Sequence, residues 1–345
     1  MSRVAVLMSG GVDSSGAAVL LTQQGHDVTG ITARMSGPAS ACCDDDDIYR
    51  ARRVCHRLDI PHIVLDLRED FDRRVLCPFI DAYLQGTTPN PCAICNREIK
   101  LGKMLGLAVR SGFDRVATGH YAAIGWMGGR PVLCEPAEAR KSQVYFLALV
   151  RPEVLDRLEF PLERTQKREV REIVASLDLA VRQGESQDLC FVPSGGYQQI
   201  LSDCWAGPPE GDVLDLEGSV VGSHKGHFAY TVGQRFGIKG RRYYVIEKRA
   251  RTNVIVVAER EEALKWRITI AGVNFFVPLE DLGDGDLTIK YRYNSPRIAA
   301  RILEAGDGHI TFLTDGACFA PAPGQIVACY RRDCMVCAGV IESAA

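Results

Sequence analysis

A turn rich in glycine and hydroxyl residues follows the first apolar segment and has the residue types that bind phosphate. The residues that would form this site are Leu7, Met8, Ser9, Gly10, Gly11, Val12, Asp13 and Ser14. Glycine lets the backbone approach an anion closely, serine adds hydroxyl donors, and a helix predicted directly after the turn directs its free N–H groups to the same place. Asp13 would repel a bare phosphate but can hold Mg²⁺, so the pattern favours a nucleotide polyphosphate bound with Mg²⁺.

The turn differs from two common nucleotide-binding motifs. The sequence contains no G-x-x-x-x-G-K-S/T loop, and no G-x-G-x-x-G follows this segment. Its S-G-G-x-D-S pattern resembles the pyrophosphatase loop of enzymes that split ATP between the α and β phosphates and adenylate a substrate oxygen. The alternative interpretation is an ordinary glycine turn after the first strand. The flanking strand and helix patterns favour the nucleotide site.

A C-x-x-C pair lies in a loop that two prolines restrict, which suits a fixed site. The pair is Cys92 and Cys95, and Cys95 is expected near a helix start beside Arg97 and Lys100, where a thiolate is favoured. The pair alone leaves zinc, redox and chance interpretations open.

Two other regions contain cysteines whose role the sequence does not decide. A second C-x-x-C pair, Cys334 and Cys337, raises the alternative of a four-cysteine zinc site formed by both pairs. Cys190 follows the polar segment 184–188, and a buried structural cysteine is the simpler interpretation of it in isolation.

The motif Thr118-Gly119-His120-Tyr121 follows the fourth predicted strand, which places it near the carboxyl edge that also carries the phosphate turn. His120 could contact a substrate or nucleotide. A histidine whose polar atoms are satisfied within the core is an equal alternative.

Composition narrows the class of protein. The chain has 345 residues, 13 cysteines and a net charge of −2. The length predicts two or three domains. Because the sequence has no apolar run of about 18 residues and no basic leader, we expect neither a membrane-spanning nor a secreted protein. The odd number of cysteines then indicates the reducing cytoplasm, with thiol or metal chemistry in preference to a disulfide scaffold.

A local excess of positive charge is hidden in the small net charge. Between His224 and Asn253 there are eight cations against one anion, Glu247. We call these cations the basic tract: Lys225, Arg235, Lys239, Arg241, Arg242, Lys248, Arg249 and Arg251. Clustered cations of this kind are typical of a surface that binds a phosphate backbone, while Asp44 to Asp47 compensate elsewhere.

Periodicity predicts an α/β half followed by β domains. Predicted strands are Val4–Met8, Asp27–Thr32, His62–Leu67 and Arg115–Thr118, and predicted helices are Ser14–Gln24, Asp46–Leu58, Phe71–Leu84, Arg97–Ser111, Lys141–Leu158, Thr165–Leu177 and Tyr197–Cys204. Such alternation favours a parallel, Rossmann-like sheet with its ligand site at the carboxyl ends of the strands. After Gly207-Pro208-Pro209, short β-prone segments between turn residues predict two small β domains, the last a barrel. The predicted domain boundaries are 1–204, 205–265 and 266–345.

With these residues in place, the chain resembles the tRNA-specific 2-thiouridylase family, which modifies the wobble uridine of certain tRNAs. The resemblance covers nearly the whole length. It rests on the order and spacing of Met8 to Ser15, Thr88 to Pro91, Cys95-Asn96, Glu98 to Lys100, Ala117 to Tyr121, Lys141 to Gln143, Tyr145 to Leu147, Asp188 to Phe191, Tyr230 to Arg235 and Pro323 to Gln325.

The resemblance implies a fold and a reaction. The fold is an adenine-nucleotide-binding α/β domain, a small central β domain and a C-terminal β-barrel, the last two gripping tRNA. In the reaction, adenylation of the uridine C2 oxygen makes AMP a leaving group, and a persulfide then attacks C2.

The resemblance also implies residue roles. Gly119 joins the phosphate turn in the ATP site, Cys190 carries the persulfide sulfur, and Cys95 is its partner. Residues implied to contact tRNA are Asn90, Pro91, Cys92, His120, Lys141, Ser142, Gln143, Tyr291, Arg292 and Gln325.

Cys92 departs from the family pattern, which commonly has an acidic residue there, so a proton-transfer role for a carboxylate is in doubt. Two hypotheses for sulfur transfer follow. Cys190 and Cys95 alone use persulfide and disulfide chemistry, or Cys92, Cys95 and Cys190 hold a [4Fe-4S] cluster with one open iron. Thiolate is a good ligand for iron, and this favours the cluster.

Two other functions remain as alternatives. One is a small-molecule adenylating ligase or synthetase with the same ATP loop, and the other is an RNA-binding module with a relict nucleotide site. The family implies tRNA and an upstream sulfur-donor protein as partners, and we expect a monomer in the absence of tRNA.

Overall fold

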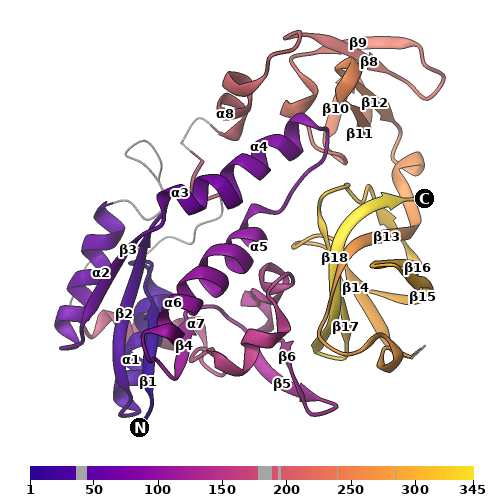
Figure 1. The fold of residues 1–345 in the computed structure, drawn as a ribbon. Coiled ribbons are helices and arrows are strands. Elements are labelled where there is room, and N and C mark those ends of the chain that lie inside the picture. Colours follow the sequence, from indigo (N-terminus) through magenta and orange to yellow (C-terminus); the bar gives the residue numbers. More distant parts are fainter. Residues whose placement is uncertain (36–44, 178–188, 193–195, 239, 284) are drawn as a thin grey trace. The chain divides into compact units, whose positions relative to one another are not determined.

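The computed structural model describes residues 1–35, 45–177, 189–192, 196–238, 240–283 and 285–345. These ranges do not include three features named from the sequence: Asp44, segment 184–188 and Lys239. The chain divides into two compact units, and Figure 1 labels their helices and strands. The first unit comprises Met1–Val75, Cys92–Pro193 and Asp333–Met335, and the second Leu76–Pro91, Ser194–Arg332 and Val336–Ala345.

The first unit is built on a parallel sheet in the order β3-β2-β1-β4-β7. Its strands are β1 (Arg3–Leu7), β2 (Asp27–Arg34), β3 (His62–Asp66), β4 (Arg115–Thr118) and β7 (Leu158–Glu159). Leu7 at the end of β1 pairs with Thr118 at the end of β4. The turns that follow these two strands therefore leave the sheet side by side, as the sequence predicts.

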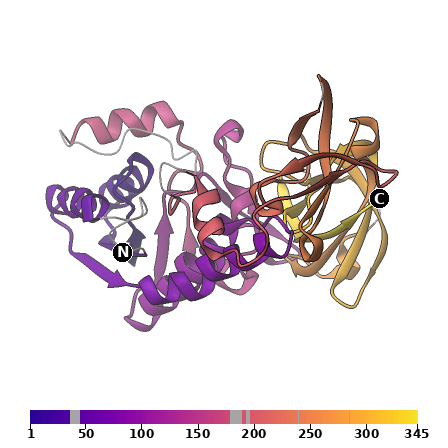
Figure 2. The same ribbon diagram turned by 90° about the horizontal axis from the view of Figure 1, so that it is seen from above.

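Three helices share a hydrophobic core with this sheet: α1 (Val12–Gln23), α2 (Asp45–Arg57) and α7 (Lys167–Ala175). α1 and α7 pack against each other, and α7 is the pink helix of Figure 2. Val6 of β1, Ala17 of α1, Val54 of α2 and Val170 of α7 lie together in this core with no more than trace exposure. The apolar periodicity of these helices is thus explained by one shared interior.

Two long helical segments are each made of several helices. Residues 68–84 comprise α3 (Arg68–Phe71), a π-helical turn (Asp72–Leu76) and α4 (Cys77–Leu84). Residues 91–110 comprise α5 (Pro91–Cys95), a π-helical stretch (Asn96–Met104) and α6 (Leu105–Arg110). The second helix begins six residues earlier than predicted, because Pro91 is well suited to the first helical position.

The predicted helix Lys141–Leu158 is wrong. The chain instead forms three short 3₁₀ segments, Ala139–Lys141, Val144–Leu147 and Pro152–Arg157, separated by turn and extended residues. Pro152 cannot continue a helix from the preceding turn.

A hairpin of β5 (Ala123–Met127) and β6 (Arg130–Cys134) was missed by the sequence analysis. Its turn is Gly128-Gly129, both at positive φ, a signal that could have found it.

The second unit contains a mixed sheet in the order β10-β11-β12-β8-β9. Its strands are β8 (Gly211–Leu214), β9 (Val220–His224), β10 (Arg235–Ile238), β11 (Arg241–Arg249) and β12 (Val254–Ala258). Val213, Val245 and Ile255 form its core. In the same unit α8 (Tyr197–Cys204) packs its Tyr197 ring against Tyr83 of α4, with the ring centroids 4.9 Å apart.

A six-stranded barrel completes the second unit. Its strands are β13 (Leu264–Phe275), β14 (Leu287–Lys290), β15 (Ile298–Gly306), β16 (His309–Phe319), β17 (Ile326–Arg331) and β18 (Cys334–Ala344). They run in the order β13-β16-β15-β14-β17-β18, and pairing of β13 with β18 closes the barrel. The predicted fold class, an α/β domain followed by a small β domain and a β-barrel, is confirmed.

One disulfide is present that the cysteine count did not predict. Cys334, in the short C-terminal segment of the first unit, pairs across from Cys134 of β6 and is disulfide bonded to it. Because Cys334 is already bonded, the alternative of a four-cysteine zinc site is wrong. Cys92, Cys95, Cys190 and Cys337 are among the described cysteines that form no disulfide bond.

Candidate nucleotide and sulfur-transfer site

The phosphate turn leaves β1 and enters α1 directly. Gly10 takes a positive φ of 71°, a conformation that favours glycine, and Gly11 is the N-cap of α1 without a side chain to cap it. The Ser14 hydroxyl accepts a hydrogen bond from the Ser9 backbone N–H at 3.1 Å and lies 3.2 Å from the Gly11 carbonyl. The loop is therefore ordered by its own serines, and the start of α1 offers N–H groups to an anion.

Gly119 touches this turn from the neighbouring strand. A Cβ atom built on Gly119 would lie 2.6 Å from both the Asp13 carbonyl carbon and the Ser14 nitrogen. Such a distance is too short for any side chain, so only glycine lets the end of β4 approach the first turn of α1 this closely. Gly119 and the phosphate turn are thus in direct contact, as the sequence predicts for their strand ends.

A lysine that the sequence analysis did not select reaches the same turn. Lys167, the first residue of α7, forms an ion pair with Asp13. No local pattern links these residues, because the contact depends on how α7 packs against α1.

Cys92 and Cys95 lie one helical turn apart in α5. The helix starts at Pro91, so Cys92 is near its N-terminus and Cys95 is inside a helix that continues to residue 110. Cys95 is thus near the start of this helix, although the helix begins before it and not after it. Asn96 anchors this region by donating its side-chain amide to the Phe146 carbonyl at 2.9 Å.

The structure brings Cys190 to Cys92. Burial and, to a smaller extent, the nearby Cys190 raise the pKa of the Cys92 thiol to about 11, and the Lys100 charge partly opposes this rise. Next to Cys190, the Phe191 ring packs against Phe71 with the centroids 5.7 Å apart, which fixes this part of the chain. Without an additional positive charge, Cys92 is therefore a neutral thiol at physiological pH.

The three cysteines are not arranged as a ready metal site. Among the residues that the structure describes, no three histidine, cysteine or carboxylate side chains are grouped so that they could hold a metal ion. The thiol donors themselves suit iron. Cluster binding would require the three sulfur atoms to draw closer together.

His120 directly follows Gly119, the glycine that touches the phosphate turn. Its Nδ1 is 2.9 Å from the Thr118 hydroxyl. Burial and, to a smaller extent, the positive charge of Lys100 lower the pKa of His120 to about 3. His120 is therefore neutral at physiological pH. Lys100, which the sequence analysis considered only as a neighbour of Cys95, influences both Cys92 and His120.

Two residues of the Lys141 to Gln143 turn support local structure. The Gln143 side-chain oxygen accepts a hydrogen bond from the Tyr121 N–H at 3.0 Å, and the Gln143 N–H donates to the Tyr121 carbonyl at 2.8 Å. The Ser142 hydroxyl accepts from the Val144 N–H at 3.3 Å. Lys141 is half-buried in the adjoining 3₁₀ segment. Ser142 and Gln143 therefore hold the segment after His120 in place.

Three residues expected at the tRNA surface are engaged inside the second unit. The buried Tyr291 hydroxyl accepts a hydrogen bond from the Phe319 N–H at 3.0 Å. The Arg292 guanidinium donates to the Val232 carbonyl at 3.2 Å and to the Ala320 carbonyl. These contacts give Tyr291 and Arg292 a structural role in the barrel.

The third, Gln325, holds the loop that precedes α5. Its side-chain amide donates to the Thr88 carbonyl at 3.0 Å and the Pro89 carbonyl at 3.2 Å. Lys248 of β11 donates to the Thr87 carbonyl at 3.1 Å, and burial lowers the pKa of Lys248 to about 8. The chain that leads to Asn90 and Pro91 is thus fixed by the barrel and by the central sheet, both in the second unit.

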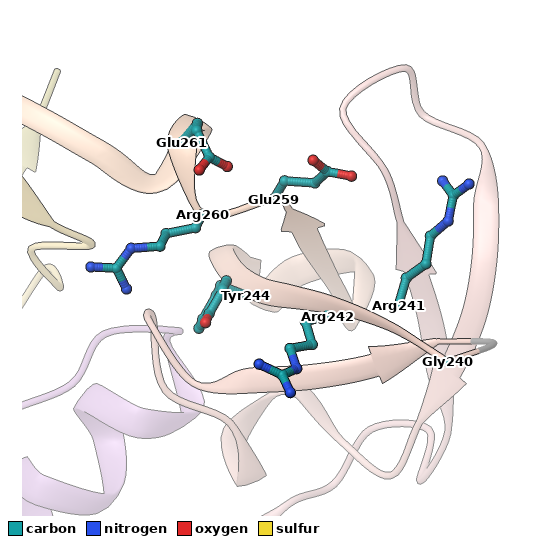
Figure 3. Close-up of a pocket in the computed structure, with 7 residues that line it drawn as sticks. All are labelled: Gly240, Arg241, Arg242, Tyr244, Glu259, Arg260 and Glu261. Carbon is teal, nitrogen blue, oxygen red and sulfur yellow. The ribbon is translucent and has the colours of Figure 1, made fainter.

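An open pocket of about 540 Å³ includes two residues of the basic tract in its lining (Figure 3). Arg241, Arg242 and Arg260 line it together with Glu259 and Glu261. The Arg249 guanidinium, by contrast, is paired with Glu247 at 2.9 Å. Arg241 and Arg242 are exposed at this pocket, and Lys225, Arg235 and Arg251 of the basic tract are exposed as well.

Sequence comparison supplies the family. The tRNA-specific 2-thiouridylase MnmA of Rhodospirillum centenum is 39% identical over 362 residues, covering 99% of this chain and 92% of that protein. The protein of the same description from Aquifex aeolicus is 38% identical over 354 residues, covering 99% of both. The chain belongs to the tRNA-specific 2-thiouridylase family.

The family models follow the architecture along the chain. The tRNA methyl transferase HUP domain matches residues 2–194, the tRNA methyl transferase PRC-barrel domain residues 200–259, and the aminomethyltransferase beta-barrel domain residues 265–341. Among solved structures, a 4-thiouridine synthetase–RNA complex with bound ATP is similar at a TM-score of 0.35 and 17% identity, covering 51% of this chain and 40% of that one. The 2-thiouridylase family assignment rests on the sequence matches.

Proposed function

We propose that the protein catalyses ATP-dependent 2-thiolation of the wobble uridine of tRNA. The observation that carries this proposal is full-length similarity to 2-thiouridylases combined with the geometry of the phosphate turn. A uridine carbonyl is a poor electrophile, and adenylation converts its oxygen into part of a good leaving group. The HUP domain supplies the nucleotide site for that step.

In this proposal the ATP site consists of the turn from Leu7 to Ser14 together with Gly119. The N-terminus of α1 and the serine hydroxyls would bind the phosphates. The Asp13 carboxylate suits Mg²⁺, a hard cation that prefers oxygen ligands and substrate phosphates. The uridine C2 oxygen attacks the α phosphate, and pyrophosphate leaves.

Sulfur then replaces the adenylated oxygen. On the persulfide route, the terminal sulfur of a Cys190 persulfide attacks C2 and the bond from C2 to the AMP oxygen breaks. The Cys95 thiolate next attacks the Cys190 sulfur, which releases 2-thiouridine and leaves a disulfide between Cys95 and Cys190. A thiol reductant must reduce this disulfide before the next turnover.

The alternative route uses a [4Fe-4S] cluster held by Cys92, Cys95 and Cys190. When bound, the cluster would supply one iron without a protein ligand, to which sulfide could bind. The proximity of Cys92 to Cys190 and the spacing of Cys92 and Cys95 support this ligand set. Each of the neighbouring Cys92 and Cys190 thiols makes it harder for the other to lose its proton. A bound cation would compensate the two negative charges, so both thiolates would become good ligands.

The substrate tRNA would contact the base loop Asn90 to Cys92, His120, the Lys141 to Gln143 turn, and residues near Tyr291, Arg292 and Gln325. The exposed part of the basic tract offers additional charge for the phosphate backbone. A separate protein would deliver sulfur, and the site of action would be the cytoplasm, with the free enzyme a monomer. In the described part of the chain, none of the helices is both long and apolar enough to span a bilayer.

The test is to measure pyrophosphate release and 2-thiouridine formation with and without tRNA, with a donor of persulfide sulfur present in one assay and free sulfide in a parallel assay. Both products should appear together and depend on tRNA. Pyrophosphate release that needs a small molecule and not tRNA would instead identify an adenylating ligase. Binding of tRNA without any pyrophosphate release would identify an RNA-binding module.

A further inference from the structure

A glycine in α1 sets how closely α7 approaches the phosphate turn. A Cβ atom on Gly16 would lie 2.5 Å from a methyl carbon of Val170, so α7 packs directly on the α1 backbone at this point. One turn toward the N-terminus of each helix, Asp13 precedes Gly16 by three residues and Lys167 precedes Val170 by three. Residues three apart lie on the same helical face. The Gly16–Val170 contact therefore places the Lys167 side chain opposite Asp13.

The Lys167 ammonium is held inside this junction. The residue is only 8% exposed, its Nζ is ion-paired with Asp13, and the same nitrogen lies 5.7 Å from the centre of the Tyr121 ring. Tyr121 follows Gly119 and His120 at the end of β4. The ammonium is thus enclosed by α1, α7 and the segment after β4, which are the elements that form the proposed ATP site.

The Lys167 ammonium lies where a positive charge is disfavoured. A purely structural role would not explain a cation there. Lys167 is the first residue of α7, and the positive end of a helix dipole disfavours a positive charge. The N-terminus of α1 adds a second positive end nearby. Carboxylates already satisfy the backbone here, since Glu138 accepts from the Lys167 N–H at 2.5 Å and Glu169 from the Gln166 N–H at 2.8 Å. Within the described residues, Asp13 is the one carboxylate that pairs with the ammonium.

We propose that Lys167 is a phosphate-binding residue of the ATP site, a role that rests on the proposed function. Without nucleotide, it neutralises Asp13. When ATP binds with Mg²⁺, the Asp13 carboxylate would hold the cation and the Lys167 ammonium would donate to the β and γ phosphates. Lys167 then stabilises the pyrophosphate that leaves during adenylation.

The test compares the affinities of the full-length chain for ATP and for AMP, with Mg²⁺ and without tRNA. Lys167→Met keeps most of the aliphatic stem and removes the charge. We expect its dissociation constant for ATP to rise about tenfold or more, as for loss of one charge-assisted hydrogen bond, while that for AMP changes by less than about twofold. Lys167→Arg should retain most of the ATP affinity. The matched control is Arg168→Met, since Arg168 is the next residue of α7 and its side chain is 82% exposed.

Equal ATP affinity of Lys167→Met and the wild type would overturn the proposal. Equal losses for ATP and AMP would also overturn it, because they would show that Lys167 only supports the fold. If Lys167→Met does not fold, the double variant Asp13→Asn/Lys167→Met removes the uncompensated carboxylate, and its ATP-to-AMP affinity ratio is compared with that of Asp13→Asn alone. If the wild-type chain binds no ATP, the proposed function itself is wrong. If the wild type and Lys167→Met bind ATP equally well, only the proposed role of Lys167 is wrong.

Discussion

At the scale of single residues, Asp13 links the chemistry of the turn to its structure. Asp13→Ala should abolish pyrophosphate release in the presence of tRNA, because it removes the carboxylate proposed to hold Mg²⁺. Affinity for tRNA should stay nearly unchanged. The substitution also leaves the buried Lys167 without its ion-pair partner, so a loss of stability on the order of 1–3 kcal/mol is expected.

Pyrophosphate release assayed beside thermal unfolding separates these two effects. The control is Asp27→Ala, which removes an exposed carboxylate paired with Arg3 at 3.6 Å. Pyrophosphate release by a folded Asp13→Ala protein would refute the assignment of this carboxylate.

Cys92 decides between the two sulfur-transfer routes. Because its thiol lies near Cys190 and one turn before Cys95, we expect Cys92→Ala to lose bound iron and 2-thiouridine formation together. The measurement is iron content, absorption spectrum and product formation of protein purified without oxygen. Cys204→Ala, which removes an exposed free thiol, is the control. Full activity of Cys92→Ala without iron would end the cluster hypothesis and leave the persulfide route.

At the scale of elements, function depends on where neighbouring strands and helices approach each other. Gly119→Ala would place a methyl group 2.6 Å from backbone atoms of Asp13 and Ser14, which cannot move aside as a flexible side chain could. We expect the first turn of α1 to shift, with a destabilisation of about 1–3 kcal/mol and a large loss of ATP affinity. Nucleotide titration and thermal unfolding measure the two effects.

Gly222→Ala is the matched control, since its nearest neighbour atom would be at 3.8 Å. Normal ATP affinity of Gly119→Ala would mean that the turn after β4 does not help to form the nucleotide site.

Lys248 connects the central sheet to the base loop. Burial lowers its folded pKa to about 8, below the value of an exposed lysine, so the folded state binds fewer protons than the unfolded state between about pH 8 and pH 10.4. The free energy of unfolding should therefore rise with pH between about pH 8 and pH 10.4. Below pH 8, the buried positive charge of Lys248 should lower the free energy of unfolding.

Lys248→Met should remove this pH-dependent gain and also lower 2-thiouridine formation, because the Thr87 carbonyl loses its hydrogen bond. Thermal unfolding of both proteins from pH 7 to pH 10 measures the effect, with the exposed Lys225→Met as control. Parallel pH profiles for Lys248→Met and the wild type would contradict the lowered pKa.

At the scale of the whole molecule, a chain of nearly balanced charge must still bind a polyanion. Neutralising Arg241, Arg242 and Arg249 together should weaken tRNA binding and flatten its dependence on salt, by about one unit of log–log slope per lost phosphate contact. Since Arg249 is paired with Glu247, most of the effect should come from Arg241 and Arg242.

Affinities measured over a range of salt concentrations test this. Arg164→Gln/Arg168→Gln, two exposed changes in the first unit, form the control. An unchanged salt slope in the triple variant would show that the basic tract faces solvent in the complex.

The sequence by itself determined the features that depend on local order. The phosphate turn, the four principal strands of the parallel sheet, α8 and the change to β domains after residue 209 are encoded by neighbouring residues, whose spacing matches strand and helix periods. The family also followed from sequence, because many short motifs occur in one order. The helix predicted over Lys141–Leu158 failed where a proline and buried apolar residues favoured 3₁₀ turns.

Only the tertiary structure decided which distant residues meet. Lys167 reaches Asp13 because glycine at position 16 lets two helices touch, and Cys190 lies near enough to Cys92 to raise its pKa although no local pattern relates them. The tertiary structure also turned Gln325 toward the base loop and joined Cys134 to Cys334. Such contacts depend on packing between segments far apart in sequence, and periodicity along a single segment carries no information about its partner.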